Sequence, residues 1–387
     1  MKYVFRKKRY ILLASLLDGV GYFILWLLRP RKPHLNQNFK NILIVRMDHL
    51  GDVLLATGVP KLIKENFPGV RVNFLTSSWA APLLEGNPFV DEVIVFDAPW
   101  FRRKNAPKGA HGLGFFGLIR HLKEKCFDLG IALRGDLREN LILRLAGVRE
   151  RIGYGITGGG FFLTKEGHYR ERIHERDRAA NLLRPLGVRT ESLKPRIYFT
   201  ADEESCAEKI LAASGLGGFK KLIGFQWGAG TVSKDWPVEL AIDFLRRFGS
   251  KFPDFKIVLV GNLSGKKDLE EICRRFPYCV NLVGKTSLRE LCALIKKFIF
   301  FIGADSGPTH IASVLSVPSI FLFSGTNRFE EWRPLAEGAS VLRHPVDCSP
   351  CGLKVCVVPG HPCMSGIRPE EVLNLLEERL KAGAGIS

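Results

Sequence analysis

Residues 302–314 read IGADSGPTHIASV and directly follow the apolar run 298–302. The apolar run predicts a buried strand. The small residues after it predict a tight turn into a helix with Pro308 at its start, where proline is favoured. Gly307 lets backbone amides approach a ligand closely, and a helix start offers unpaired N–H groups and a positive dipole end. The stretch therefore predicts either an anion site, with Asp305 accepting sugar hydroxyls, or an ordinary strand-to-helix connection with Asp305 as a cap.

The same alternation of apolar runs and amphipathic stretches covers most of the chain and is typical of βαβ units. We expect strands at 41–46, 70–76, 92–97, 128–133, 222–227, 256–260, 280–282, 298–302 and 319–323. We expect helices at 80–85, 137–146, 237–249, 266–276, 288–296, 308–315 and 369–381. The segment 189–203, with a proline and acidic turn residues, is the expected domain boundary. The predicted fold is α/β, with two Rossmann-like doubly wound domains, a cleft between them and ligands beyond the carboxyl ends of the strands.

A second glycine-containing loop, GAGTVSKDWP at 228–237, follows another expected strand. The hydroxyls of Thr231 and Ser233 and the ammonium of Lys234 are suitable groups for a diphosphate. The alternative is a solvated lysine beside a helix cap. Two such loops in one half of the chain are stronger evidence for an anion site than either loop alone.

An N-terminal loop, RMDHLGD at 46–52, follows the first expected strand. Gly51 permits a sharp turn that places Asp52 near a helix N-terminus. There Asp52 is either a helix cap, the commoner role, or a general base. Asp48 and His49 are alternative bases.

Charge and composition limit the class of protein. The chain has 387 residues, is 46% hydrophobic and carries a formal charge of +18, which suits a two-domain globular protein with anionic partners.

Two stretches that look like nucleotide-binding motifs lack the sequence context that such motifs require. The glycines of 153–158 are followed by more glycine where a dinucleotide-binding helix should begin, and 261–266 is one residue short of a P-loop.

Much of the positive charge lies in residues 1–34, where basic residues flank the apolar run 10–28 on both sides. Nothing after the run resembles a signal-peptide cleavage site. The run is interrupted by Asp18, Gly19 and Gly21. Both of its flanks are basic, whereas a spanning helix has an excess of basic residues on one side. We therefore expect a helix lying in the interface of an anionic leaflet. A helix packed on the protein's own surface is the alternative, and a true span is the least favoured.

Four of the nine cysteines, Cys348, Cys351, Cys356 and Cys363, lie close together in sequence. Their spacing allows a structural zinc site, disulfides or free thiols, and we assign no metal. The other five are expected to be buried small hydrophobic residues.

Three stretches carry a family resemblance: residues 41–76 (NILIVRMDHLGDVLLATGVPKLIKENFPGVRVNFLT), 228–237, and 301–323 (FIGADSGPTHIASVLSVPSIFLF). With the cysteine-rich tail, they resemble glycosyltransferase family 9, the ADP-heptose:lipopolysaccharide heptosyltransferases. The resemblance implies the GT-B fold, inversion at the anomeric carbon and no metal or other cofactor. It assigns the acceptor to the N-terminal domain and the nucleotide sugar to the C-terminal domain. The expected domains are a membrane-associating helix (1–36), an acceptor domain (37–195), a donor domain (196–368, cysteine-rich loop 348–363) and a C-terminal helix and tail (369–387).

Carried over position by position, the resemblance makes Asp52 the catalytic base and Lys234 the residue that neutralises the donor phosphates. It makes Asp305 the acid that holds the heptose hydroxyls. The remaining donor-binding residues are Gly228, Thr231, Ser233, Ser306, Gly307, Thr309 and His310. From charge alone, we expect the basic loop Arg102, Arg103, Lys104 and Lys108 to bind acceptor carboxylates or phosphates.

The implied enzyme transfers heptose from ADP-heptose to a lipid-linked glycan, the lipopolysaccharide inner core. It works as a monomer, peripheral on the cytoplasmic face of the inner membrane. The family usually has Gly-Pro-Thr-Asp-Pro where this chain has SGTNR at 324–328, so the donor can differ. The alternatives are a related transferase using another nucleotide sugar, and a non-catalytic membrane-attached nucleotide-binding protein. A nucleic-acid partner is not expected, because no recognition module is present.

Overall fold

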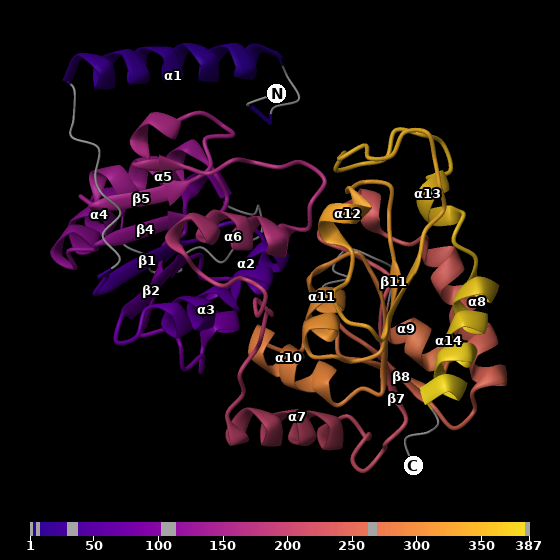
Figure 1. Ribbon diagram of the computed structural model, residues 1–387. Helices are drawn as coiled ribbons and strands as arrows, with labels where there is room; N and C mark the ends of the chain where they lie inside the picture. The colour runs from indigo at the N-terminus through magenta and orange to yellow at the C-terminus, as the bar shows by residue number, and fades with distance from the viewer. Residues whose placement is uncertain (1–2, 5–7, 29–37, 102–113, 262–268, 384–387) are drawn as a thin grey trace. The chain divides into compact units, whose positions relative to one another are not determined.

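The computed structural model describes residues 3–4, 8–28, 38–101, 114–261 and 269–383, which form two compact units, Met1–Tyr198 and Phe199–Ser387 (Figure 1). Each unit contains a parallel sheet with helices packed against it. This is the α/β fold of two doubly wound domains that the sequence predicts.

The N-terminal unit has a sheet of six strands among the described residues, in the order β3-β2-β1-β4-β5-β6. The strands are β1 (Asn41–Val45), β2 (Arg71–Thr76), β3 (Glu92–Val95), β4 (Leu129–Ala132), β5 (Glu150–Gly153) and β6 (Lys165–Glu166). The helices are α1 (Lys8–Leu28), α2 (Leu50–Ala56), α3 (Val59–Asn66), α4 (Phe115–Glu124), α5 (Leu137–Leu145) and α6 (Glu175–Leu183). Short 3₁₀ turns are η1 (Ala81–Leu84), η2 (Pro99–Phe101), η3 (Gly160–Phe162) and η4 (Arg184–Leu186).

The C-terminal unit repeats this plan, with the order β12-β11-β10-β7-β8-β9 in its described part. The strands are β7 (Leu222–Gln226), β8 (Lys256–Leu259), β9 (Cys279–Asn281), β10 (Phe300–Ala304), β11 (Ser319–Leu322) and β12 (Ala339–Leu342). The helices are α7 (Ala201–Ala213), α8 (Val238–Lys251), α9 (Leu269–Arg275), α10 (Leu288–Lys296), α11 (Gly307–Val314), α12 (Phe329–Trp332), α13 (Pro362–Ser365) and α14 (Pro369–Gly383), with the 3₁₀ turn η5 (Val232–Lys234).

Both sheets have the strand order in which the direction of winding reverses at the centre. In the N-terminal unit the reversal lies between β1 and β4, and in the C-terminal unit between β7 and β10. Ligands of doubly wound sheets bind beyond the carboxyl ends of the strands at such a reversal. The loops after these four strands are therefore where functional side chains are expected.

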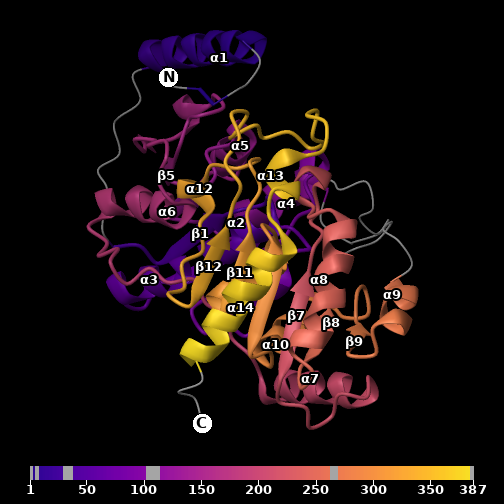
Figure 2. The same cartoon turned by 90° about the vertical axis from the view of Figure 1, so that its right-hand side faces the viewer.

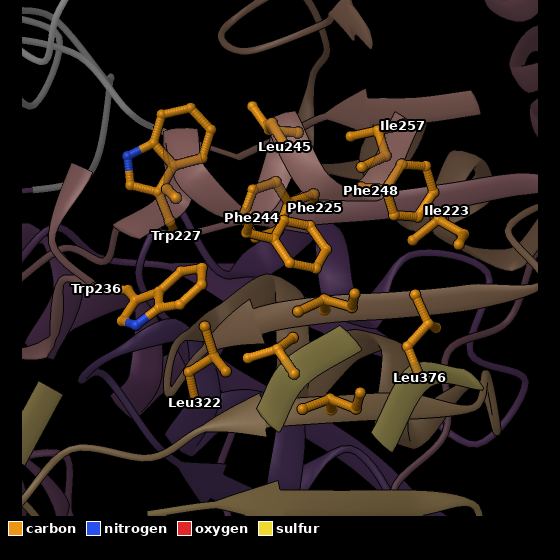
Figure 3. Packing of buried hydrophobic residues seen from close by; sticks show 14 of the residues in the cluster. Ile223, Phe225, Trp227, Trp236, Phe244, Leu245, Phe248, Ile257, Leu322 and Leu376 are labelled. Carbon is orange, nitrogen blue, oxygen red and sulfur yellow. The ribbon is translucent and has the colours of Figure 1, made fainter. Parts of the chain in front are cut away.

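Aromatic side chains fill the core of the C-terminal unit, as Figure 3 shows. Phe225 of β7 and Phe244 of α8 are fully buried, with ring centroids 5.0 Å apart, and Trp236 packs on both. Burying an aromatic ring of this size stabilises the fold by roughly 2–3 kcal/mol. The core fixes the loop after β7, because Trp236 ends that loop and its indole N–H donates to the Ile367 carbonyl at 3.0 Å.

The last helix closes this core, as expected from its apolar stripe. Val372 and Leu376 of α14 are fully buried in the same cluster as α8, and the two helices lie side by side in Figure 2. The prediction that this stripe packs against the body of the protein is confirmed.

Some elements differ from the expectation. The helix expected at 80–85 is the 3₁₀ turn η1. Between the expected strands 92–97 and 128–133, where no helix was expected, α4 begins at Phe115, because Leu118, Ile119 and Leu122 give it a buried face. The structure also contains β5, β6, α6, α7 and β12, which were not expected from the sequence. The expected boundary segment 189–203 contains the start of α7, where Thr200 and Glu203 form a capping box.

Candidate active-site residues of the two domains

Asp305 is the centre of a polar cluster in the C-terminal unit. Its side chain is 1% exposed, and its Oδ2 lies 2.7 Å from Lys234 Nζ. Its Oδ1 lies 3.1 Å from His310 Nε2, and the Asn327 side-chain amide donates to Oδ2 at 3.0 Å. A second contact joins Lys234 Nζ to the Asp305 carbonyl at 3.3 Å.

The fold brings these residues together at one edge of the sheet. Lys234 ends η5 after β7, Asp305 directly follows β10, and Asn327 follows β11, the next strand in the sheet. His310 lies in the first turns of α11, which Ser306 precedes as N-cap. The cluster thus lies where β7 and β10 end, at the reversal of strand order, which is where this fold class binds ligands.

The environment of Asp305 keeps it ionised. Burial alone would raise its pKa, but the charge of Lys234 and the contact with His310 hold the pKa well below its usual range. A carboxylate offers about four acceptor positions, and the contacts with Lys234, His310 and Asn327 use three of them. Asp305 is thus a permanent hydrogen-bond acceptor, suited to a sugar hydroxyl and unsuited to a phosphate.

Three predicted donor-binding hydroxyls already have partners within the protein. Ser306 Oγ donates to Gln226 Oε1 at 2.9 Å, and Thr309 Oγ1 donates to the Ala304 carbonyl at 2.6 Å. The buried Ser233 hydroxyl donates to the Leu353 carbonyl. These hydroxyls hold the loops in place, which leaves backbone N–H groups as the helix-start feature suited to an anion.

The glycine-containing loop after β7 and the start of α11 hold the remaining predicted donor residues. Gly228 is buried two residues beyond the end of β7, and Thr231 is the half-buried N-cap of η5. Gly307 is the first residue of α11, with Pro308 in the first turn as predicted.

The cysteine-rich loop 348–363 is hydrogen-bonded to the loops after β7 and β11. Its backbone accepts from Ser233, and the Cys351 and Gly352 N–H groups donate to the Gly325 and Thr326 carbonyls at 3.0 and 2.8 Å. The cysteines of this loop have free thiols. Within the described residues, no group of three or more His, Cys, Asp and Glu side chains is arranged to hold a metal ion.

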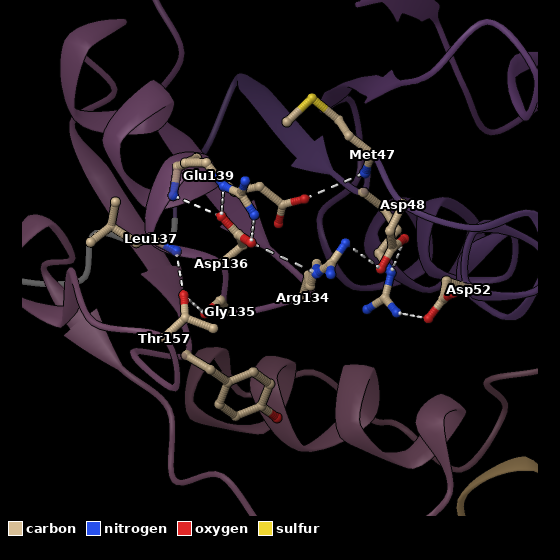
Figure 4. Close-up of polar contacts among 12 residues, drawn as sticks. Met47, Asp48, Asp52, Arg134, Gly135, Asp136, Leu137, Glu139 and Thr157 are labelled. Carbon is tan, nitrogen blue, oxygen red and sulfur yellow. Dashed lines mark hydrogen bonds and ion pairs between the residues drawn. The ribbon is translucent and has the colours of Figure 1, made fainter. Parts of the chain in front are cut away.

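Arg46 is the centre of a second cluster, in the N-terminal unit. Figure 4 shows its partners Asp48 and Asp52, with Arg134 nearby. Its guanidinium lies 2.9 Å from Asp48 Oδ1, 2.5 Å from Asp52 Oδ1 and 3.6 Å from Glu175 Oε2. Arg46 is 6% exposed, and these carboxylates hold its pKa above the usual value despite its burial. Arg134, after β4, reaches Asp48 Oδ2 at 3.6 Å, so the loops after β1 and β4 meet here.

Asp52 lies inside the first turn of α2 rather than at its cap. The N-cap residue is His49, whose side chain makes no capping hydrogen bond. The helix-cap alternative for Asp52 is therefore wrong: its carboxylate is held by Arg46 instead.

Two buried carboxyl groups in this cluster have raised pKa values. Burial, opposed by Arg46, raises the pKa of Asp48 to about 7, and burial together with the nearby Asp48 charge raises that of Glu139 to about 8. Glu139 on α5 is completely buried, and its Oε1 accepts the Met47 N–H at 3.4 Å. Glu139 is thus protonated near neutral pH, which removes one negative charge from beside Asp48.

Arg46, Arg134, Glu139 and Asn327 are polar residues that the sequence analysis did not single out. Arg46 and Asn327 lie in stretches it quoted, but their role depends on contacts made in three dimensions. The expected acceptor residues Arg102, Arg103, Lys104 and Lys108 lie outside the described residues.

The fold is that of a two-domain α/β protein, and each unit has a polar cluster at the reversal of strand order in its sheet. Residues 115–361 match the model of glycosyltransferase family 9 (heptosyltransferase). The chain therefore belongs to this family and is a glycosyltransferase with the GT-B fold.

Relatives of this family cover most of the chain. Lipopolysaccharide heptosyltransferase 3 of Escherichia coli (strain K12) is 27% identical over 304 residues, covering 75% of this chain and 84% of that protein. The solved family 9 glycosyltransferase of Veillonella parvula has a TM-score of 0.76 at 23% identity, covering 90% of this chain and 99% of that one. The solved E. coli ADP-heptose lipopolysaccharide heptosyltransferase II has a TM-score of 0.70 at 20% identity, covering 89% and 99%.

Proposed function

We propose that this protein transfers a heptose from ADP-heptose to a lipid-linked glycan, the inner core of a lipopolysaccharide, with inversion at the anomeric carbon. Membership of family 9 supports the class of reaction. The single observation that carries the donor assignment is the buried Asp305 carboxylate beside Lys234, which pairs a sugar-hydroxyl acceptor with a cation for a diphosphate.

The donor contacts follow from the chemistry of these groups. An ammonium has three N–H groups, so Lys234 can bind a phosphate oxygen beyond its two contacts with Asp305. The start of α11 adds backbone N–H groups and its positive dipole end. Both would stabilise the negative charge that develops on ADP as it leaves.

The transfer is a single displacement. The acceptor hydroxyl oxygen attacks the anomeric carbon, the bond from that carbon to the ADP oxygen breaks, and the hydroxyl proton passes to Asp52. One attack from the side opposite to ADP inverts the configuration. Arg46 holds Asp52 Oδ1, and we assign Oδ2 as the oxygen that takes the proton.

We assign the acceptor to the N-terminal domain, residues 37–195, and the nucleotide sugar to residues 196–368. In this proposal the basic loop Arg102, Arg103, Lys104 and Lys108 binds acceptor phosphates or carboxylates. A monomer, peripheral on the cytoplasmic face of the inner membrane, fits a water-soluble donor and a lipid-linked acceptor.

A second candidate is a family 9 transferase with a different nucleotide sugar. Asn327 favours it, because this residue contacts Asp305 and lies in the loop 324–328 that departs from the usual family sequence. A change next to the carboxylate that would hold the sugar hydroxyls can alter which sugar fits.

A donor comparison tests the proposal. Purified full-length protein is titrated calorimetrically with ADP-heptose, ADP-glucose and UDP-glucose, and the product of transfer is analysed for its anomeric configuration by NMR. We expect ADP-heptose to bind at least about tenfold more tightly than the others and the product to be inverted. Tighter binding of another nucleotide sugar supports the second candidate, and a retained configuration contradicts the single displacement.

A further inference from the structure

α1 carries more than half of the large apolar side chains that are exposed among the described residues. Leu12, Leu16 and Trp26, for example, are 63%, 60% and 65% exposed. The helix is long and apolar enough to cross a membrane, and only 17% of it is buried. An apolar surface of this extent is not expected to face water.

One narrow side of α1 is turned toward the protein. Its buried or half-buried positions are Ile11, Ala14, Asp18, Gly21 and Leu25. Their spacing of three and four residues places them in one stripe along the helix. The stripe contains the only acid of the helix and one of its two glycines, while the exposed remainder is almost entirely apolar.

Polar contacts join α1 to the loop between β5 and β6 and to β6 itself. Asp18, 2% exposed, accepts the Gly159 N–H at 2.6 Å through Oδ1 and the Tyr3 hydroxyl at 2.9 Å through Oδ2. The Tyr22 hydroxyl donates to Glu166 Oε2 at 2.8 Å. Gly159 has φ +77°, so its N–H is aimed by a backbone conformation that glycine readily adopts.

We infer that α1 lies in the plane of an anionic phospholipid leaflet, with its Asp18 stripe docked on the N-terminal domain and its other sides inserted among the lipid chains. This inference refines the membrane placement proposed above and is independent of the donor.

The position of the docking contacts excludes a span for this docked helix. Asp18 is near the middle of the 21-residue helix, and it is there that the loop carrying Gly159 contacts it. In a spanning helix the middle residues lie in hydrocarbon, where the polar backbone of such a loop would lose its water. A helix parallel to the surface keeps the loop on the water side and the apolar sides in lipid.

Charge identifies lipid as the partner. Five basic residues precede position 10 and three lie at 29–32 in the sequence, so the apolar segment has basic residues at both ends. Each basic residue near an anionic leaflet contributes roughly 1 kcal/mol of binding free energy. This pattern matches lipid headgroups around an inserted apolar helix better than it matches an apolar protein groove.

A depth measurement tests the orientation. Leu17→Trp is made in a Trp26→Phe background, and the protein is reconstituted into phosphatidylglycerol–phosphatidylcholine vesicles with bromine atoms at shallow or deep acyl positions. The fluorescence of Trp26→Phe alone is subtracted. We expect shallow bromines to quench the introduced indole at least about twofold more strongly than deep ones. Stronger quenching by deep bromines establishes a span, and no binding to anionic vesicles establishes a different partner; either result overturns the inference.

A matched pair of glycine variants tests the docking. A Cβ added at Gly21 would overlap the Phe161 ring, whereas one at Gly19 meets open space. Both Gly→Ala changes favour the helix equally. In vesicle-bound protein we expect Gly21→Ala to raise amide exchange of the peptide containing Gly159 at least about fivefold, and Gly19→Ala to leave it unchanged.

Equal exchange in wild type and both variants would mean that α1 is not docked through this stripe. Transfer to a water-soluble acceptor fragment is measured in parallel and should match wild type in both variants. If wild type also shows no transfer to this fragment, the result contradicts the proposed function and not the docking.

Discussion

The ammonium of Lys234 lies 2.7 Å from the carboxylate of Asp305, although 71 residues separate them in the chain. This ion pair joins the loop after β7 to the turn after β10, at the reversal of strand order in the C-terminal sheet. It places a cation beside the carboxylate that we propose holds the sugar hydroxyls. The sequence predicts a role for each residue separately, but their pairing is a finding of the structure.

Replacing Lys234 by Ala leaves the Asp305 carboxylate buried without its cation. Because breaking a buried pair is costly, we expect a loss of about 3 kcal/mol in the free energy of unfolding. We also expect at least about tenfold weaker binding of ADP-heptose. Denaturant titration and calorimetry measure the two effects. Lys221→Ala is the control, because Lys221 pairs with Asp254 at the surface and should change neither quantity.

Asn327→Asp places a second carboxylate against Asp305 Oδ2, where the Asn327 amide now donates. Like charges at this distance destabilise each other, whereas Asn327→Ala loses one hydrogen bond to a charged group. We expect unfolding free energy at pH 7 to fall in the order wild type, Asn327→Ala, Asn327→Asp, with steps of about 1–2 kcal/mol. Equal stability of the Ala and Asp variants in denaturant titrations would show that Asn327 does not donate to Asp305.

Glu139→Gln tests the protonation of the buried cluster. The pKa of Glu139 is raised from 4.5 to about 8, so between these values the folded protein keeps a proton that the unfolded chain has released. The contribution of Glu139 to the free energy of unfolding is therefore largest at acid pH and falls as the pH rises through this range. Gln does not titrate. We therefore expect the unfolding free energy of the variant, relative to that of wild type, to rise by on the order of 3 kcal/mol between pH 5 and pH 8.

Denaturant titrations of both proteins across that range measure the difference. Glu65→Gln is the control, because Glu65 is an exposed partner of Lys61. A constant difference between Glu139→Gln and wild type would mean that Glu139 is ionised in the folded protein.

The elements that the sequence predicted are those with a strong apolar pattern. The strand, turn and helix around residues 302–314 are where they were expected, because Phe300–Ala304 is buried and Pro308 marks the helix start. β5 was missed because its four residues, Glu150–Gly153, carry two charges and no alternation. A strand of this kind forms by pairing with β4, which lies elsewhere in the chain.

The polar clusters were predicted only in part, for a related reason. A motif indicates which residues lie near a ligand, but not which side chains hold each other. Thr309 and Ser233 were assigned to the donor, and the structure shows their hydroxyls donating to backbone carbonyls. A glutamate in a helix such as Glu139 would ordinarily be expected to face solvent. Only the structure shows that it is buried, with its carboxyl accepting the Met47 N–H.

The central claim is that Asp52 takes the proton from the acceptor hydroxyl. The most direct test is the rate of heptose transfer from ADP-heptose to lipid-extracted core acceptor by wild type, Asp52→Ala and the surface control Glu65→Ala, with ADP-heptose affinity measured for each. Removal of a general base costs roughly 10²–10⁴ in rate. We predict that loss for Asp52→Ala with donor affinity unchanged, and wild-type transfer for Glu65→Ala. Transfer by Asp52→Ala within a few fold of wild type would contradict the account.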